Sequence, residues 1–296
     1  METNTPISNL TQPSNRIINA WCLYDWANSV YLLVITSTIF PVYYSGVTAA
    51  VFESEKVLFF GMEVVNTVLY SYSISISFLI VAILSPLLSG IADYGGNKKS
   101  FLKFFTLLGS VCSALLFFFN GKNVEFGITC SVLASVGYSG SLVFYNAYLP
   151  EITTKDNFDQ VSARGYSFGY VGSVLLLVLS FITIEFYEIL GFSSELQAVR
   201  LSFLLVGVWW LVFAQISFYY LPKTQRSSYP VWKLISKGQQ EIMKVVVELR
   251  RFRSMKFYLI AFFFYISGVQ TIMFLAATFG DKELKIESSK LLLRLR

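Results

Sequence analysis

The clearest pattern in the sequence is a series of long apolar runs separated by shorter polar segments. A membrane-spanning helix needs about 20 mostly apolar residues. The runs that meet this length are 19–44, 67–91, 101–120, 124–148, 167–190, 199–221 and 255–279. They are long and unbroken rather than short and alternating, so strands are not expected. The pattern therefore predicts an all-α integral membrane protein with seven spanning helices.

The composition supports a chain that lives in lipid. Hydrophobic residues make up 55% and charged residues 14%, and the mean hydropathy is +0.59, whereas soluble proteins carry about 25% charged residues. There is no His, and Cys22, Cys112 and Cys130 each lie alone in an apolar run, where we expect small core residues. No metal site or catalytic residue is predicted, and the lack of HExxH and GxSxG motifs makes an enzyme the least favoured class.

Basic residues are unevenly distributed between the two sides of the predicted helices. They gather in the N-terminal tail, in the loops near 98 and 155, and in the segment 222–256, while the opposite side of the first six runs has Lys56, Lys122 and Arg200. The positive-inside rule then places the N-terminus in the cytoplasm of a cell (inner or plasma) membrane. The predicted division is a tail at 1–18, a six-helix bundle at 19–221, a basic cytoplasmic loop at 222–254, and a seventh helix with a tail at 255–296.

The basic loop also carries apolar residues at near-helical spacing, as in WKLISKGQQEIMKVVVELRRF at 232–252. This pattern predicts an amphipathic helix lying on the anionic inner leaflet. Nucleic acid is not an expected partner, because these basic residues are tied to membrane spans. After the seventh run, the basic tail ends in SSKLLLRLR, which resembles the start of a further helix.

The first apolar run contains a carboxylate, Asp25. A charge at mid-bilayer is costly and such residues usually face a polar interior. Asn28 and Ser29 follow at helical spacing, and Thr36 is expected to return to the same face, which gives a polar stripe. One interpretation is a cavity group that binds a cation, a proton or a substrate amine. The alternative is an interfacial Asp, since Arg16 lies only about nine residues away.

Two later runs also carry polar stripes. Hydroxyls recur in the fourth run at Tyr138, Ser141, Tyr145 and Tyr148, and these side chains either line a cavity or bond to neighbouring helices. The seventh run has Tyr265, Ser267, Gln270 and Thr271 around Gly268, where a helix break is conceivable. Packing against a neighbouring helix explains this cluster equally well.

The fifth run begins with small residues, Gly165, Gly169, Gly172 and Ser173, in a GxxxG spacing. Small residues let two membrane helices approach closely, so packing is the favoured interpretation. Before this run, Pro150 is expected to end the fourth helix. Glu151 and Arg164 are a candidate gate pair across the loop that follows, and solvated loop charges are the alternative.

The loop between the second and third runs reads SGIADYGGNKKSF, at 89–101. It resembles the G-x-x-x-D-x-x-G signature, followed by basic residues, of the major facilitator superfamily. A generic short basic loop is the alternative. Asp93, Gly96, Lys98 and Lys99 match this signature. Its first glycine falls on Ser89, and Gly90 follows one position later. These residues, with Gly90 as the first glycine, are the candidate conformational motif.

Further stretches resemble one family of this superfamily, the vacuole effluxer-like permeases: LYDWANS at 23–29, VFYNAYLPEI at 143–152, SARGYSFGYVGS at 162–173 and FYISGVQTI at 264–272. The resemblance implies about twelve spans, so the chain is expected to be truncated after its seventh helix. It also implies secondary transport of small polar solutes, such as amino acids, by alternating access, with no cofactor beyond a coupling proton or cation. The cavity candidates are Asp25, Asn28, Tyr138, Ser141, Tyr145, Tyr265 and Gln270.

A different interpretation is that the chain does not transport. It would then be a truncated remnant, or a half-module that needs a partner bundle or a second copy of itself to complete a cavity. In either case the lipid bilayer is its expected surrounding.

Overall fold

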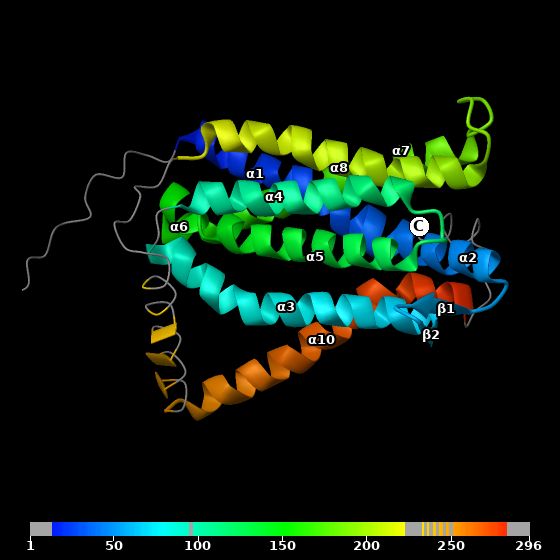
Figure 1. The fold of residues 1–296 in the computed structure, drawn as a ribbon. Coiled ribbons are helices and arrows are strands. Elements are labelled where there is room, and N and C mark those ends of the chain that lie inside the picture. Colours follow the sequence, from blue (N-terminus) through cyan, green and yellow to red (C-terminus); the bar gives the residue numbers. More distant parts are fainter. Residues whose placement is uncertain are drawn as a thin grey trace, which may run out of the picture.

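The structure is a computed structural model that describes residues 14–94, 97–222 and 251–282, together with scattered positions between 233 and 248. Within these residues, seven helical spans are long and apolar enough to cross a membrane. They run roughly side by side, apart from the seventh, which crosses the others obliquely (Figure 1). The prediction of seven spanning helices is confirmed.

The first span is a composite of three helical pieces. Helix α1 (Asn15–Val30) leads into a π-helix, η1 (Tyr31–Ile39), which continues into α2 (Phe40–Phe52). The span starts at Asn15, slightly earlier than predicted, and no loop interrupts it. A π-helix bonds each residue to the fifth residue on and is rare, so it rotates the side chains that follow relative to an α-helix.

The segment after the first span departs from the prediction. Where no strand was expected, β1 (Lys56–Phe59) and β2 (Met62–Val65) form an antiparallel hairpin. Its two-residue turn places Phe60 at φ 47° and Gly61 at φ +80°, the left-handed values that tight hairpin turns need. Strands were not expected because that prediction rested on the long apolar runs, and the hairpin lies in the short segment between two of them.

The remaining spans follow in order. They are α3 (Asn66–Tyr94); α4 (Lys98–Leu115) with the short η2 (Leu116–Phe118); α5 (Val124–Asn146) with α6 (Leu149–Ile152); η3 (Lys155–Asn157) with α7 (Phe158–Glu185); α8 (Glu195–Tyr220); and α10 (Arg253–Lys282). Pro150 was expected to end a helix. Instead α5 ends at Asn146 and Pro150 lies in the first turn of α6, where the missing N–H leaves no hydrogen bond unmade.

Helix α1 lies at the centre of the bundle and contacts both α7 and α8. Other helices bond directly to its backbone: Ser217 Oγ donates to the Ala20 carbonyl at 2.7 Å, and Trp209 Nε1 donates to the Trp26 carbonyl at 3.3 Å. The Tyr24 hydroxyl also bonds to Thr106 Oγ1 of α4, at 2.7 Å. These contacts fix the height and rotation of α1, and therefore of Asp25.

The free cysteines Cys22, Cys112 and Cys130 are buried, as predicted for core residues. Near the hairpin end, an aromatic cluster joins the first span to its neighbours. The centroid of the Phe40 ring lies within 6.3 Å of the ring centroids of Tyr44 in α2, Tyr70 in α3, Phe119 directly after η2, and Phe203 in α8. This cluster anchors the π-helix from its C-terminal side.

The seventh span, α10, is packed differently from the others. It contacts η1 and α2, but none of the residues in its most apolar window is buried. Gly268 was considered as a possible break, yet α10 runs unbroken through it. A single glycine lowers helix propensity by only about 1 kcal/mol, which a long apolar helix tolerates.

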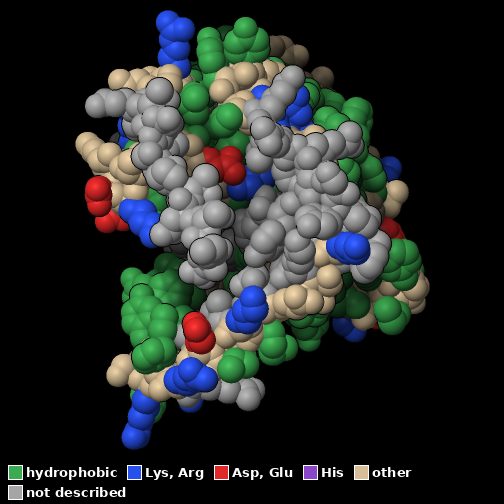
Figure 2. All heavy atoms as spheres, turned by 90° about the vertical axis from the view of Figure 1, so that its left-hand side faces the viewer, with side chains coloured by type: hydrophobic (Ala, Val, Ile, Leu, Met, Phe, Trp, Pro, Cys, Tyr) green, Lys and Arg blue, Asp and Glu red, His purple; other side chains and the backbone are tan. Residues whose placement is uncertain are grey.

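At the end where α1 begins, the connections are held by lysines. Lys98 Nζ lies 2.7 Å from Glu151 Oε1 and 3.1 Å from the Ala147 carbonyl, and Lys99 Nζ donates to the Leu221 carbonyl at 2.7 Å. The predicted partner of Glu151 was Arg164, but Glu151 pairs with Lys98 and the Arg164 guanidinium lies over the Phe168 ring. Lys and Arg side chains are spread over this end of the molecule (Figure 2).

Candidate functional site

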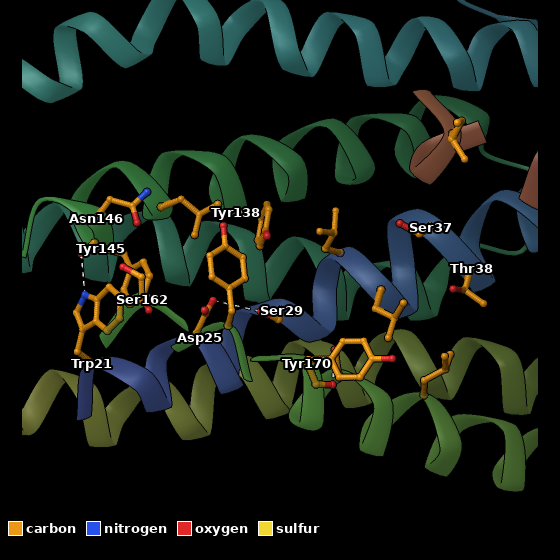
Figure 3. A pocket seen from close by; sticks show the side chains of 17 residues that line it. Trp21, Asp25, Ser29, Ser37, Thr38, Tyr138, Tyr145, Asn146, Ser162 and Tyr170 are labelled. Carbon is orange, nitrogen blue, oxygen red and sulfur yellow. Dashed lines mark hydrogen bonds between the residues drawn. The ribbon is translucent and has the colours of Figure 1, made fainter. Parts of the chain in front are cut away.

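A cavity of about 570 Å³ lies along the first span. Its lining residues come from α1, η1, α5 and α7, with Ile272 contributed by α10. Figure 3 shows these side chains converging on a space between the helices. Ligand cavities in proteins typically measure about 300–1,000 Å³, so this one has the size of a small-molecule site.

Asp25 lies in the wall of this cavity with 9% of its surface exposed. Ser29 Oγ, one helical turn along, donates to Asp25 Oδ1 at 3.2 Å (Figure 3). Within the described part of the chain, no Lys or Arg forms an ion pair with Asp25. The carboxylate therefore faces the cavity with one side-chain donor and no countercharge from its neighbours.

Aromatic rings make up much of the remaining wall. Trp21 stacks on Tyr145, with ring centroids 4.2 Å apart and an interplanar angle of 9°, and Trp21 Nε1 also donates to the Tyr145 carbonyl at 3.0 Å. Tyr138, Tyr166 and Tyr170 line the cavity as well. The site thus combines one carboxylate with several electron-rich rings.

Close packing between α1 and α7 places these groups next to one another. A Cβ built on Gly165 would lie 2.8 Å from the Trp21 ring, and one on Gly169 would lie 2.5 Å from Ser29 Oγ. Gly172 meets Trp26 in the same way. The glycine face was predicted to serve helix packing, and these contacts agree with that interpretation.

The π-helix changes which residues of the first span face the cavity. Thr36 was expected to share the face of Asp25, but it is buried and does not line the cavity, whereas Leu32, Leu33, Ser37 and Thr38 do. Because a π-helix takes more residues for each turn, an α-helical spacing rule places Thr36 on the wrong face. No signal in the sequence pointed to this change of register.

The other predicted cavity residues fall into three groups, the third of which lies on α10. Tyr138 and Tyr145 line the cavity beside Asp25. Asn28 and Ser141 are fully buried behind its wall: neither amide atom of Asn28 has a partner in the described structure, and Ser141 Oγ donates to the Tyr138 carbonyl at 2.7 Å. Their proposed contact with substrate stays a prediction.

Tyr265 and Gln270 are placed outside the cavity. Both belong to α10, both are exposed, and Ile272 is the α10 residue in the lining. Tyr265 has 68% of its surface exposed. These two positions were chosen because they are polar residues in an apolar run, and polarity alone does not give the direction of a side chain on a helix that has few neighbours.

Several lining residues escaped the prediction. They are Trp21, Ser162, Tyr166, Tyr170, Leu177 and the residues of η1. Tyr166 and Tyr170 follow Gly165 and Gly169 by one position each, so they flank the glycine face at a spacing of four. That spacing could have identified them, because residues beside a close helix contact also border any cavity next to it.

The loop motif lies at the end where α1 begins. Gly90 is buried in α3, Lys98 is buried at the start of α4, and Lys99 bonds to the end of α8. Gly96 and the side chain of Asp93 lie outside the described residues. The motif's role in conformational change stays a prediction.

Comparison with known proteins gives the family. The family described as "Vacuole effluxer Atg22 like" matches residues 13–295. The chain belongs to this family. Among curated proteins, it is 33% identical over 283 residues to the uncharacterized MFS-type transporter YxiO of Bacillus subtilis (strain 168), covering 93% of this chain and 62% of that one.

More distant relatives include fungal proteins. Autophagy-related protein 22 of Yarrowia lipolytica is 22% identical over 312 residues, covering 79% of this chain and 52% of that protein. Autophagy-related protein 22-1 of Aspergillus clavatus is 23% identical over 303 residues, with 78% and 50% covered. No solved structure matches. The chain therefore spans about half to three fifths of the length of these Atg22-like relatives.

Proposed function

We propose that this Atg22-like chain carries a solute-binding half of a secondary transporter that moves small polar solutes, such as amino acids, by alternating access. The observation that carries the proposal is the cavity on the first span, where a buried carboxylate faces a space walled by membrane-spanning helices. Buried ionisable groups in membrane helices commonly mark substrate or ion pathways. Asp25 is the group we assign to cation or proton binding.

Alternating access requires two bundles that rock about a site between them. The described helices supply one bundle and α10, and the cavity is lined by the first span, α5 and α7 together with Ile272 of α10. The basic residues at the end where α1 begins support a cytoplasmic N-terminus in a cell membrane (Figure 2). Cysteines introduced at either end and labelled from outside the cell would test this orientation.

The function is tested by uptake or efflux measured in vesicles. Asp25→Asn keeps the size of the side chain and removes its charge, and we expect transport to fall at least tenfold. Glu185→Gln is the matched control, because it removes a carboxylate from the last turn of α7, outside the cavity. Unchanged transport of every candidate amino acid and amine by Asp25→Asn would overturn the proposed role of Asp25.

A second candidate is a half-module that works only with a partner bundle. The exposure of α10 favours it, since this helix contacts the first span and, among the described residues, none in its most apolar window is buried. The mass of the detergent-solubilised protein and cross-linking through cysteines introduced on α10 would test it. A strictly monomeric chain that transports by itself would exclude this candidate.

A further inference from the structure

The wall of the cavity has an unusually simple charge pattern. Among the described residues that line it, Asp25 alone has an acidic side chain, and none is Lys or Arg. The nearest candidate for a cation on α7, Arg164, lies over the Phe168 ring with 5.8 Å from its guanidinium carbon to the ring centroid, and it is not part of the wall. The cavity thus offers a negative charge to a ligand and no positive one.

The rings of the wall favour the same sign of charge. Trp and Tyr faces attract ammonium groups within about 6 Å of the ring centroid, and the wall carries Trp21 and four tyrosines. Trp21 and Tyr145 stack on each other, so each has at most one face free for a ligand. Tyr166 and Tyr170 line the cavity and have 77% and 71% of their surfaces exposed, so they lie at its open edge, where a ligand can reach the rings.

Hydroxyl groups complete the wall without adding charge. Ser29 holds one oxygen of Asp25, and Ser37, Thr38, Ser162 and Ser173 lie at other points of the lining. Hydroxyls and tyrosine rings can accept hydrogen bonds from an N–H donor. A ligand ammonium would therefore find an anion, acceptor oxygens and ring faces in one place.

We propose that this half of the cavity selects a small organic monocation, a protonated amine or a quaternary ammonium, over a neutral or zwitterionic solute of the same skeleton. The proposal rests on the proposed function, in that the cavity is taken as the solute site. The volume of about 570 Å³ accommodates a molecule of this class with some water.

The alternatives are less well matched to the described wall. A neutral solute brings no countercharge to Asp25, so it leaves either an unpaired carboxylate, whose desolvation is unfavourable, or a group that must take up a proton before the cavity closes. An amino acid satisfies Asp25 through its ammonium, but its own carboxylate meets no basic side chain of this wall. A monocation satisfies Asp25 and leaves no second charge to be paired.

The test is equilibrium binding to the full 296-residue chain in lipid nanodiscs, using ligands that share an isopentyl skeleton. Isopentylamine is the cation, leucine the zwitterion and 3-methylbutan-1-ol the neutral form, and choline with its neutral isostere 3,3-dimethylbutan-1-ol checks the quaternary case. We expect each cation to bind at least tenfold more tightly than its neutral form, and isopentylamine to bind more tightly than leucine.

Variants then separate the charge from the rings. Asp25→Asn should abolish the preference for the cation, whereas Glu185→Gln should retain it. Tyr170→Leu should weaken isopentylamine binding about threefold, while Tyr170→Phe, which keeps the ring, should bind nearly as the original chain does. Because Tyr170 is exposed, neither of its variants is expected to disturb folding.

The outcomes distinguish this inference from the proposed function. Tighter binding of leucine, equal binding of cation and neutral form, or a cation preference that survives Asp25→Asn would overturn the inference, while measured transport of leucine would leave the transporter proposal standing. No saturable binding of isopentylamine or choline would also overturn it. Cation binding that depends on Asp25 without transport by the 296-residue chain would support this inference, overturn transport by the chain alone, and favour the half-module.

Discussion

Replacing Gly169 with alanine tests whether the contact between α7 and α1 holds Asp25 in place. The new Cβ would lie 2.5 Å from Ser29 Oγ, 3.2 Å from the side-chain carboxyl carbon of Asp25 and 3.2 Å from the backbone carbonyl oxygen of Asp25. Non-bonded carbon atoms prefer about 3.5–4.0 Å. Ser29 can rotate away and break its bond to Asp25, but the backbone carbonyl cannot, so the two helices must separate slightly.

The expected magnitude follows from three contributions. Overpacking costs about 1–3 kcal/mol, and loss of a hydrogen bond to a charged group costs about 1.5 kcal/mol or more. Alanine gains about 1 kcal/mol over glycine in helix propensity. With mid-range values the sum is a net loss of about 2.5 kcal/mol, which lowers the melting temperature by roughly 5 °C, since 1 kcal/mol shifts it by about 2–4 °C in chains of 150–250 residues and by less in a longer chain.

The buried cysteines provide the assay, because Cys22, Cys112 and Cys130 react with a fluorogenic maleimide only as the chain unfolds. Gly46→Ala in α2 is the matched control, since nothing lies within 4 Å of its Cβ, and it should melt at or slightly above the original temperature. Adding Ser29→Ala to Gly169→Ala removes the nearest obstacle and should recover part of the loss. Equal melting temperatures for Gly169→Ala and Gly46→Ala would refute the reasoning.

Two further substitutions can be measured by the same dye assay. Glu151→Gln leaves the buried Lys98 ammonium without its countercharge and should destabilise the protein by about 2 kcal/mol. This is less than for a fully buried pair, because the Glu151 side chain is 33% exposed. The control, Glu63→Gln, removes an exposed partner of Lys56 on the hairpin and should change stability by under about 0.5 kcal/mol. Gly137→Ala drives its Cβ into the backbone of Gly109 on α4, which cannot move aside, and should cost about 3 kcal/mol. Equal melting temperatures for the two Gln variants, or an unshifted Gly137→Ala, would contradict these assignments.

The spans were predictable because length and apolarity alone specify a helix in lipid. The partners of charged side chains were not. Glu151 was assigned to Arg164 from their proximity in sequence, but it pairs with Lys98, at the start of α4, a helix that packs against α5. Such a pairing depends on which helix ends are neighbours, and that information comes only from packing.

The cavity residues also divide into those that helical spacing placed correctly and those that it did not. The α-helical spacing correctly put Tyr138 and Tyr145 on one face of α5, since that helix is regular from end to end. It failed for Thr36, because η1 changes the register inside the span. The residues of η1 are β-branched or leucine for the most part, and nothing in such a run distinguishes a π-helix from an α-helix before the neighbours are known.

The position of Asp25 follows from the combination of these features. Glycines on α7 allow α1 to come close enough for Asp25 to be shielded on that side, while hydrogen bonds from Ser217 and Trp209 to carbonyls of α1 fix the rotation of the helix. The π-helix that follows turns Ser37 and Thr38 into the cavity instead of Thr36. Shielding without pairing is costly for a carboxylate. It is sustained here by packing that surrounds the group on the protein side and leaves it open to the cavity, where the cation or proton that we propose would supply the countercharge that the described residues lack.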